Sequence, residues 1–258
     1  MRTAGIICEC NPLHAGHQYL MEQARRAGAE GIVCVMSGCF TQRGEPAVLN
    51  PRSRAELLLS AGADAVLELP YPYSCAGAER FAAAGVRILD RLGVDTLWFG
   101  SECGDIGLLR RAARIASGEV FAQLYRERCA GGSRGTAAAY FDCLREQGGL
   151  GDRFSPNDIL GIAYLRALAR LHSRMEPFTV LRAGSGYHEE TPREGEFPSA
   201  TALRRLLFSG GADALSPWMP EEQLRVVRRE LDAGSAPARM ELAERALLAS
   251  LRLMPPER

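Results

Sequence analysis

His14 and His17 stand three residues apart on either side of Gly16, directly after a short apolar run. The run is typical of a buried strand, and a helical pattern follows it from residue 18 to residue 27. The first N–H groups of a helix lack internal partners and carry the positive end of its dipole, so they favour an anion. Gly16 lets the backbone approach such an anion, and two imidazoles can add hydrogen-bond donors. The segment therefore predicts a phosphate-sized anion site between a strand and a helix.

Apart from the histidines, the basic side chains are all arginines, because none of the 31 Lys and Arg residues is a lysine. Any phosphate clamp must therefore use arginine or histidine. The 31 acidic residues bring the formal charge to zero, so bulk charge neither supports nor excludes a nucleic-acid partner. The eight cysteines are dispersed, without CxxC pairs or the compact spacing of a zinc site, which disfavours a metal site.

Composition and length predict an ordinary folded chain. With 258 residues, 47% hydrophobic and 24% charged, the sequence can bury one large core, or one core with an appendage. The N-terminus lacks a basic region followed by a long apolar segment, and no stretch reaches the roughly 18 to 20 apolar residues of a membrane span. We therefore expect a cytoplasmic enzyme with no membrane association.

Alternating strands and helices are expected to position the histidine segment. Short apolar runs that end at turns predict further strands at residues 31–38, 63–69 and 95–100. Helical periodicity predicts helices at residues 53–61 and 78–92. This alternation indicates a parallel sheet with right-handed crossovers, in which ligands bind beyond the carboxyl ends of the strands. Three turns should therefore meet at one edge of the sheet, at residues 11–17, 37–43 and 100–102.

The second half of the sequence is mainly helical. The pattern predicts a helical insertion at about 108–150, a helix at 155–171, and a last strand at 178–181 that leads into a glycine-rich turn at 182–188. Ser199 caps a predicted helix that runs to Leu207, and the tail from residue 216 is helical. We expect an α/β fold in which residues 1–210 form the main domain and residues 211–258 a helical C-terminal extension.

The pattern Asn-Pro-x-His-x-Gly-His at residues 11–17 resembles the signature of the nucleotidyltransferase superfamily related to the HIGH-motif enzymes. In that superfamily the histidines hold a triphosphate and stabilise the transition state at the α-phosphate. The resemblance implies a Rossmann-like nucleotidyltransferase fold.

Further motifs resemble, in order, those of the bacterial tRNA(Met) cytidine acetate ligase family, at residues 36–47, 68–70, 99–102, 155–161 and 186–188. The resemblance implies that acetate and ATP form acetyl-adenylate and release pyrophosphate. We expect Mg²⁺ to help stabilise the negative charge that grows in this step. The resemblance also implies that the acetyl group passes to N4 of the wobble cytidine of elongator tRNA(Met). The chain would then be a cytoplasmic RNA-modifying ligase.

The resemblance implies catalytic roles for His14 and His17. It implies an ATP site formed by Ile7, Cys8, Glu9, Cys10, Asn11, Pro12, Leu13, His14, Ala15, Gly16, His17, Gln18, Tyr19, Leu20, Gly100, Asn157 and Arg182. The residue types leave alternatives at three of these positions. Gly100 could let a nucleotide lie against a strand end, or it could be a simple turn glycine. Asn157 could bind a ligand or cap its helix, and Arg182 could clamp a phosphate or be a solvated charge.

Further candidates for phosphate or acetate contacts are Arg43, Ser199, Thr201 and Arg204. Arg43 lies in a polar loop that could line the part of the site that binds acetate or RNA, or could be only a connector. The other three lie in a segment that resembles a later transferase motif, in which hydroxyls and a basic residue close over phosphates; the same segment could be a capped amphipathic helix. Glu9 is either a paired core carboxylate or a polar group near ribose and magnesium.

Two features depart from the family pattern. Family members usually carry a Lys-Trp-containing stretch where residues 49–52 stand, and a lysine at the position of Leu181. The family typically continues into a C-terminal region that helps to hold tRNA, so a shortened member is one interpretation. Two other functions remain open: a nucleotidyltransferase that adenylylates a small metabolite without RNA, and a nucleotide-binding module with impaired catalysis.

Overall fold

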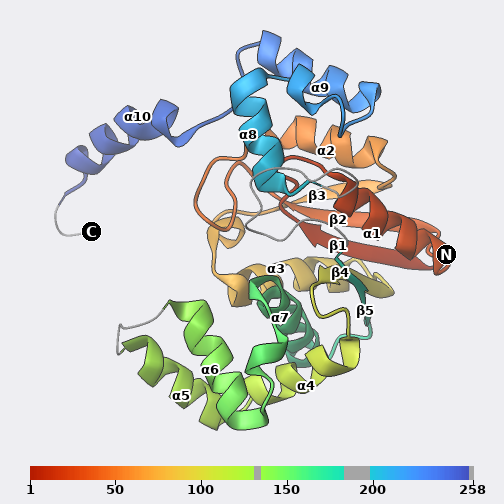
Figure 1. The fold of residues 1–258 in the computed structure, drawn as a ribbon, viewed down its shortest axis with the longest axis vertical. Coiled ribbons are helices and arrows are strands. Elements are labelled where there is room, and N and C mark those ends of the chain that lie inside the picture. The colour runs from red at the N-terminus through yellow and green to blue at the C-terminus, as the bar shows by residue number, and fades with distance from the viewer. Residues whose placement is uncertain (131–134, 183–197, 256–258) are drawn as a thin grey trace.

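The computed structural model describes residues 1–130, 135–182 and 198–255, and its centre is a five-stranded parallel sheet (Figure 1). The strands are β1 (Thr3–Cys8), β2 (Gly31–Ser37), β3 (Ala65–Leu69), β4 (Thr96–Ser101) and β5 (Glu176–Leu181). Their order in the sheet is β3-β2-β1-β4-β5, and every neighbouring pair is parallel. The α/β, Rossmann-like fold expected from the sequence is confirmed.

The strand order reverses between β1, the central strand, and its neighbour β4. Ile6 of β1 lies in register with Cys34 of β2 on one side and with Trp98 of β4 on the other. The connections that leave these strands turn to opposite sides, which opens a crevice beyond their carboxyl ends. The residues after β1 and after β4 therefore lie at the position where such sheets bind ligands.

Helices cover both faces of the sheet (Figure 1). One face carries α1 (Ala15–Arg26), α2 (Pro51–Ser60), α8 (Ala200–Gly210) and α9 (Glu221–Asp232). The other carries α3 (Ala78–Arg91), α4 (Ile106–Ala116) and α7 (Pro156–Leu171). Side chains of β1 alternate between two buried apolar clusters: Ile6 and Cys8 pack toward α1, and Ile7 packs toward α3. Burial on both faces explains why the strands read as continuous apolar runs.

The crossover from β4 to β5 contains the region that the sequence indicated as a helical insertion. It forms α4, α5 (Glu119–Ala130) and α6 (Thr136–Gly148), which lead into α7. Phe121 of α5 and Tyr140 of α6 contact edge to face and belong to the same apolar cluster as α3 and α7. These helices are therefore packed onto the core through α4 and α7.

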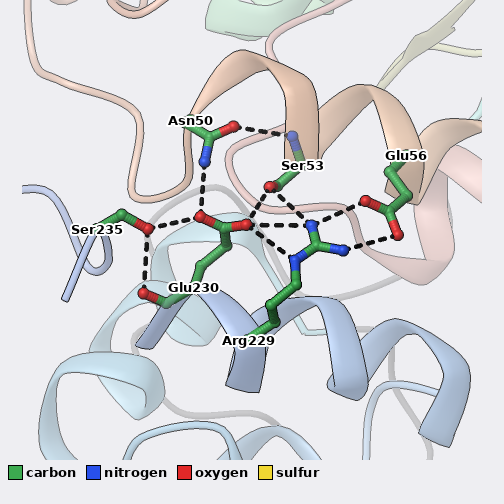
Figure 2. Close-up of polar contacts among 6 residues, drawn as sticks. All are labelled: Asn50, Ser53, Glu56, Arg229, Glu230 and Ser235. Carbon is green, nitrogen blue, oxygen red and sulfur yellow. Dashed lines mark hydrogen bonds and ion pairs between the residues drawn. The ribbon is translucent and has the colours of Figure 1, made fainter. Parts of the chain in front are cut away.

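A polar network joins α9 to α2 (Figure 2). We call it the α2–α9 network; its residues are Asn50, Ser53, Glu56, Arg229, Glu230 and Ser235. The buried Glu230 carboxylate accepts hydrogen bonds from Asn50 Nδ2 at 2.7 Å, Ser53 Oγ at 2.7 Å and Ser235 Oγ at 2.5 Å. The hydrogen bonds from Ser235 and Ser53 lower the pKa of Glu230. Leu224 and Val227 of α9 also lie in the apolar cluster of α2, so α9 is packed on the main body.

The C-terminal helix α10 (Met240–Leu253) buries none of its residues and extends away from the other helices (Figure 1). The expected domain boundary at residue 210 stays a prediction. Among the helices of the described ranges, none is long and apolar enough to cross a membrane.

Helix starts differ from the expected positions because side chains cap them. The first helix begins at Ala15 rather than residue 18, since His14 accepts a hydrogen bond from the backbone of Gly16. The second begins at Pro51 rather than residue 53, since Asn50 Oδ1 accepts a hydrogen bond from Ser53 N at 2.9 Å. In both cases the chemistry of the cap, rather than the apolar period, sets the boundary.

Candidate functional site

A pocket of about 380 Å³ lies at the carboxyl ends of β1 and β4, between α1 and α7. This volume is within the usual range for a small-molecule site. It brings together most of the residues expected from the sequence: Ile7, Cys8, Glu9, Cys10, Asn11, His14, Gly16, His17, Tyr19, Leu20, Arg43, Gly100, Asn157, Arg182 and Ser199. The expected residues that do not line it are Pro12, Leu13, Ala15, Gln18, Thr201 and Arg204.

The two histidines form a reciprocal cap at the start of α1. His14 Nδ1 accepts a hydrogen bond from Gly16 N at 3.1 Å, and His17 Nδ1 accepts one from His14 N at 3.3 Å. A ring nitrogen that accepts a hydrogen bond carries no proton, so each neutral imidazole carries its proton on Nε2. The ring centroids are 4.0 Å apart. The cap therefore leaves two Nε2–H donors side by side in the pocket.

Both imidazoles are neutral in the free protein at pH 7. Burial, followed by the charges of His17 and Arg182, holds the pKa of His14 well below its usual value. Burial and the nearby Arg182 lower the pKa of His17 to about 4. The histidines therefore meet an incoming anion as hydrogen-bond donors rather than as cations, and the field of a bound polyanion would raise both pKa values.

Two glycines make room for this arrangement. A Cβ on Gly16 would lie 2.8 Å from Cε1 of His14, so only glycine leaves space for the capping ring. A Cβ on Gly100, near the end of β4, would lie 3.0 Å from Cγ of Arg182. Gly100 therefore lets the Arg182 side chain cross the end of β4 close to the backbone. Both glycines serve close approach, and neither has a positive φ.

Glu102 organises the α7 side of the pocket, and sequence reasoning assigned it no role. Its carboxylate accepts hydrogen bonds from Asn157 Nδ2 and from Ser155 Oγ, the latter at 2.6 Å, and lies 3.6 Å from Arg182 Nε. Ser155 and Asp158 form the capping box of α7, so Asn157 is not the cap. Glu102 was visible in the motif at residues 99–102, but its partners lie more than fifty residues away.

Arg54 does not line the pocket but supports the loops beside it, a role that the sequence did not indicate. Its guanidinium is fully buried and donates to the backbone carbonyls of Glu9 at 2.7 Å, Leu49 at 3.0 Å and Gly38. It thereby fixes the loops after β1 and β2 to each other. The Glu9 carboxylate accepts a hydrogen bond from Gln42 N at 2.8 Å, which joins the same two loops. In the sequence, Arg54 looked like any charged residue of a helix.

Arg204 and Thr201 hold the histidine loop from outside the pocket. Arg204 Nη1 donates to Asn11 O at 2.9 Å, and its Nη2 donates to Thr201 Oγ1 at 3.1 Å. Ser199 caps α8 by accepting a hydrogen bond from Ala202 N at 3.1 Å, and it also lines the pocket. The glycine-rich turn and the motif at 186–188 lie outside the described residues, apart from Arg182.

Comparison with known proteins agrees with this geometry. The family model described as HIGH Nucleotidyl Transferase matches residues 1–258. The tRNA(Met) cytidine acetate ligase of Syntrophotalea carbinolica is 41% identical over 97% of this chain and 61% of that protein. The protein of the same name from Caldicellulosiruptor bescii is 38% identical over 93% of this chain and 60% of that protein.

Solved structures show the same similarity. The Thermotoga maritima TmcAL apo crystal structure has a TM-score of 0.88 at 32% identity, over 99% of this chain and 63% of that chain. A second structure of that protein, bound with alpha-thio ATP, has a TM-score of 0.84 over 98% of this chain and 62% of that chain. The chain thus spans about three fifths of the length of these relatives. The resemblance to tRNA(Met) cytidine acetate ligases is confirmed over the part they share, and the chain belongs to the HIGH nucleotidyl transferase family.

Proposed function

We propose that this chain is a ligase that activates acetate with ATP and transfers the acetyl group to N4 of the wobble cytidine of elongator tRNA(Met). The observation that carries this proposal is the pair of Nε2–H donors that the His14–His17 cap turns into the pocket. The names of the relatives, and the alpha-thio ATP bound to the Thermotoga maritima protein, support ATP and acetate as substrates. A tRNA substrate implies an activity in the cytoplasm.

In the first step a carboxylate oxygen of acetate attacks the α-phosphorus of ATP in line with the departing pyrophosphate. A P–O bond to acetate forms, and the bond between the α-phosphorus and the bridging oxygen breaks. Negative charge grows on the phosphate oxygens, so the step needs fixed donors more than it needs a base. His14, His17 and the first N–H groups of α1 supply those donors, and Arg182 adds a positive charge held by Glu102.

In the second step N4 of the cytidine attacks the acetyl carbonyl carbon. The bond between that carbon and the adenylate oxygen breaks, AMP leaves with that oxygen, and N4 loses one proton to solvent. Neutral imidazoles suit both steps, since they donate hydrogen bonds without an added charge that would hold AMP tightly. Arg43 lines the pocket at the loop after β2 and is a candidate contact for either anion.

Mg²⁺ is expected to arrive with the nucleotide. Within the described ranges no three His, Cys, Asp or Glu side chains come together as a metal site. That fits Mg²⁺, which usually binds substrate phosphates and waters together with one or two carboxylates. Glu9 is a carboxylate that lines the pocket and could supply such a ligand. Bound to the triphosphate, the ion would neutralise charge on the leaving pyrophosphate.

The test is ATP–pyrophosphate exchange with and without acetate, followed by mass analysis of tRNA(Met) for N4-acetylcytidine. Acetate-dependent exchange together with the acetylated nucleoside is the expected result. Exchange that depends on a different small acid, with a rate unaffected by tRNA, would instead indicate a metabolite adenylyltransferase. ATP binding without pyrophosphate release under any of these conditions would indicate a nucleotide-binding module.

A further inference from the structure

One stripe of α7 forms a wall of the pocket from its rim to its inner end. Asn157, Leu160, Gly161 and Tyr164 all line the pocket, and their spacing of three, four and seven residues places them on one face of the helix. Asn157 is held at the rim by Glu102. Tyr164 lies two turns further along, in the apolar cluster between α7 and β4.

Tyr164 is a buried polar group without a hydrogen-bond partner in the described part of the chain. The residue is 2% exposed, and among the described residues no atom makes a hydrogen bond with its hydroxyl. Burial, with the nearby Cys8 and Glu9 side chains, holds the pKa of this phenol well above its usual value, so the hydroxyl keeps its proton. Tyr164 lines the pocket, and a buried hydroxyl with no partner costs free energy, which a ligand that accepts its hydrogen bond would recover.

Apart from Glu9, the pocket-lining side chains packed near Tyr164 are mainly apolar. Ile7, Phe81 and Phe99 line the pocket and are buried, and the Phe99 and Tyr164 ring centroids are 5.5 Å apart. Gly161 allows this packing, since a Cβ there would lie 2.8 Å from the Phe99 ring. One hydroxyl donor among apolar walls matches a small acyl group, with one oxygen to accept the hydrogen bond and a methyl group to bury.

We propose that Tyr164 binds the acyl substrate: its hydroxyl donates to an oxygen of acetate, and Ile7, Phe81 and Phe99 enclose the methyl group and limit the length of the acyl chain. This proposal rests on the proposed function, because it names the subsite of the acid that ATP activates. It assigns two parts of one pocket to two substrates, with the triphosphate at the histidine cap and the acid between α7 and β1.

The first test is the variant Tyr164→Phe in acetate-dependent ATP–pyrophosphate exchange. Loss of one hydrogen bond to a charged acid is expected to raise KM for acetate about 10- to 100-fold, with KM for ATP unchanged. The variant also removes a hydroxyl that has no partner among residues 1–130, 135–182 and 198–255, so the Tm of the variant should equal or exceed that of the wild type. Tyr140→Phe is the matched control, because Tyr140 is a buried tyrosine of the same cluster that does not line the pocket.

The second test addresses chain length. Phe81→Leu is expected to raise the ratio of kcat/KM for propionate to that for acetate by about 10-fold or more, since one methylene is worth roughly that much in an apolar pocket. Phe121→Leu, a buried phenylalanine of α5 outside the pocket lining, should leave the ratio unchanged.

The outcomes separate this inference from the proposed function. A wild-type protein without acetate-dependent exchange would overturn both. Exchange in the wild type, with an unchanged KM for acetate in Tyr164→Phe, would overturn the acyl subsite alone. A lower Tm of Tyr164→Phe, together with equal increases in KM for ATP and for acetate, would overturn the acyl subsite in favour of a packing role for Tyr164.

Discussion

His17 performs two tasks with two different nitrogens, and substitutions can separate them. Its Nδ1 accepts a hydrogen bond from His14 N and so caps α1, while its Nε2–H, which has no acceptor among the described residues, can donate to a phosphate. Asparagine places an amide oxygen near the position of Nδ1, so His17→Asn keeps an acceptor for the cap and removes the outer donor. Glutamine reaches further, so His17→Gln keeps a donor near the position of Nε2 and weakens the cap.

The two variants should therefore fail in opposite ways. A lost donor to the developing charge is worth about 2.7 to 4 kcal/mol of barrier, so His17→Asn should lower kcat for pyrophosphate exchange by about 10²- to 10³-fold with little change in stability. A lost cap costs about 0.5 to 2 kcal/mol, so His17→Gln should lower the free energy of unfolding by that amount and keep more activity than His17→Asn.

The assay pairs exchange kinetics at saturating ATP and acetate with urea denaturation of the same preparations. His17→Ala removes both the Nδ1 acceptor and the Nε2–H donor, so it should lower both kcat and the free energy of unfolding. Wild-type kcat in His17→Asn would refute the assignment of His17 Nε2 to the phosphate. Equal stability of His17→Gln and the wild type would refute the capping role of Nδ1.

Three further predictions follow from the contacts of the site and the core. The lowered pKa of His17 means that the unfolded chain binds a proton that the folded chain excludes, so the free energy of unfolding should fall as pH drops from about 6.5 toward about 4. Urea denaturation across this pH range measures the effect, and a constant free energy of unfolding would contradict the lowered pKa. Over the same range ATP binding should take up protons, because the bound polyanion raises the histidine pKa values. Calorimetry in two buffers of different ionisation enthalpy measures this uptake, and its absence would contradict that rise. Arg182→Ala should raise KM for ATP about 10- to 100-fold. Gly100→Ala should raise this KM less, because the flexible Arg182 side chain can shift away from the added Cβ. Pyrophosphate-exchange kinetics at varied ATP would check both variants, and an unchanged KM in Arg182→Ala would contradict a phosphate contact by Arg182. Glu230→Ala should lower the free energy of unfolding, measured by urea denaturation, by about 2 to 3 kcal/mol. Substitution of the exposed Glu222 on the same helix, Glu222→Ala, should change it by less than about 0.5 kcal/mol. Equal changes in the two variants would contradict a stabilising role of the α2–α9 network.

The parallel sheet and the histidine turn could be predicted because their signals are local in the sequence. A buried parallel strand reads as an apolar run, and the His14–Gly16–His17 spacing places cap, glycine and donor within one turn of helix. The α/β class and the edge at which the turns meet follow directly from such signals.

Glu102, Arg54 and Tyr164 could not be assigned in the same way, because their roles depend on partners that are distant in the sequence. Glu102 acquires its role from Ser155, Asn157 and Arg182, which only the fold brings near it. In the sequence, Tyr164 has the spacing of an ordinary core residue of a buried helix. What distinguishes it is a missing partner among the described residues, and a sequence does not display that.

The central claim is that the pocket joins an oxygen of acetate to the α-phosphorus of ATP, and isotope transfer tests it most directly. The protein would be incubated with ATP, Mg²⁺ and acetate labelled with ¹⁸O in both carboxylate positions, with tRNA(Met) or hydroxylamine to accept the acetyl group. The account predicts AMP that carries one ¹⁸O atom from acetate, because the bridging oxygen of acetyl-adenylate stays with the phosphate. AMP without ¹⁸O, or label found in orthophosphate beside ADP, would contradict it.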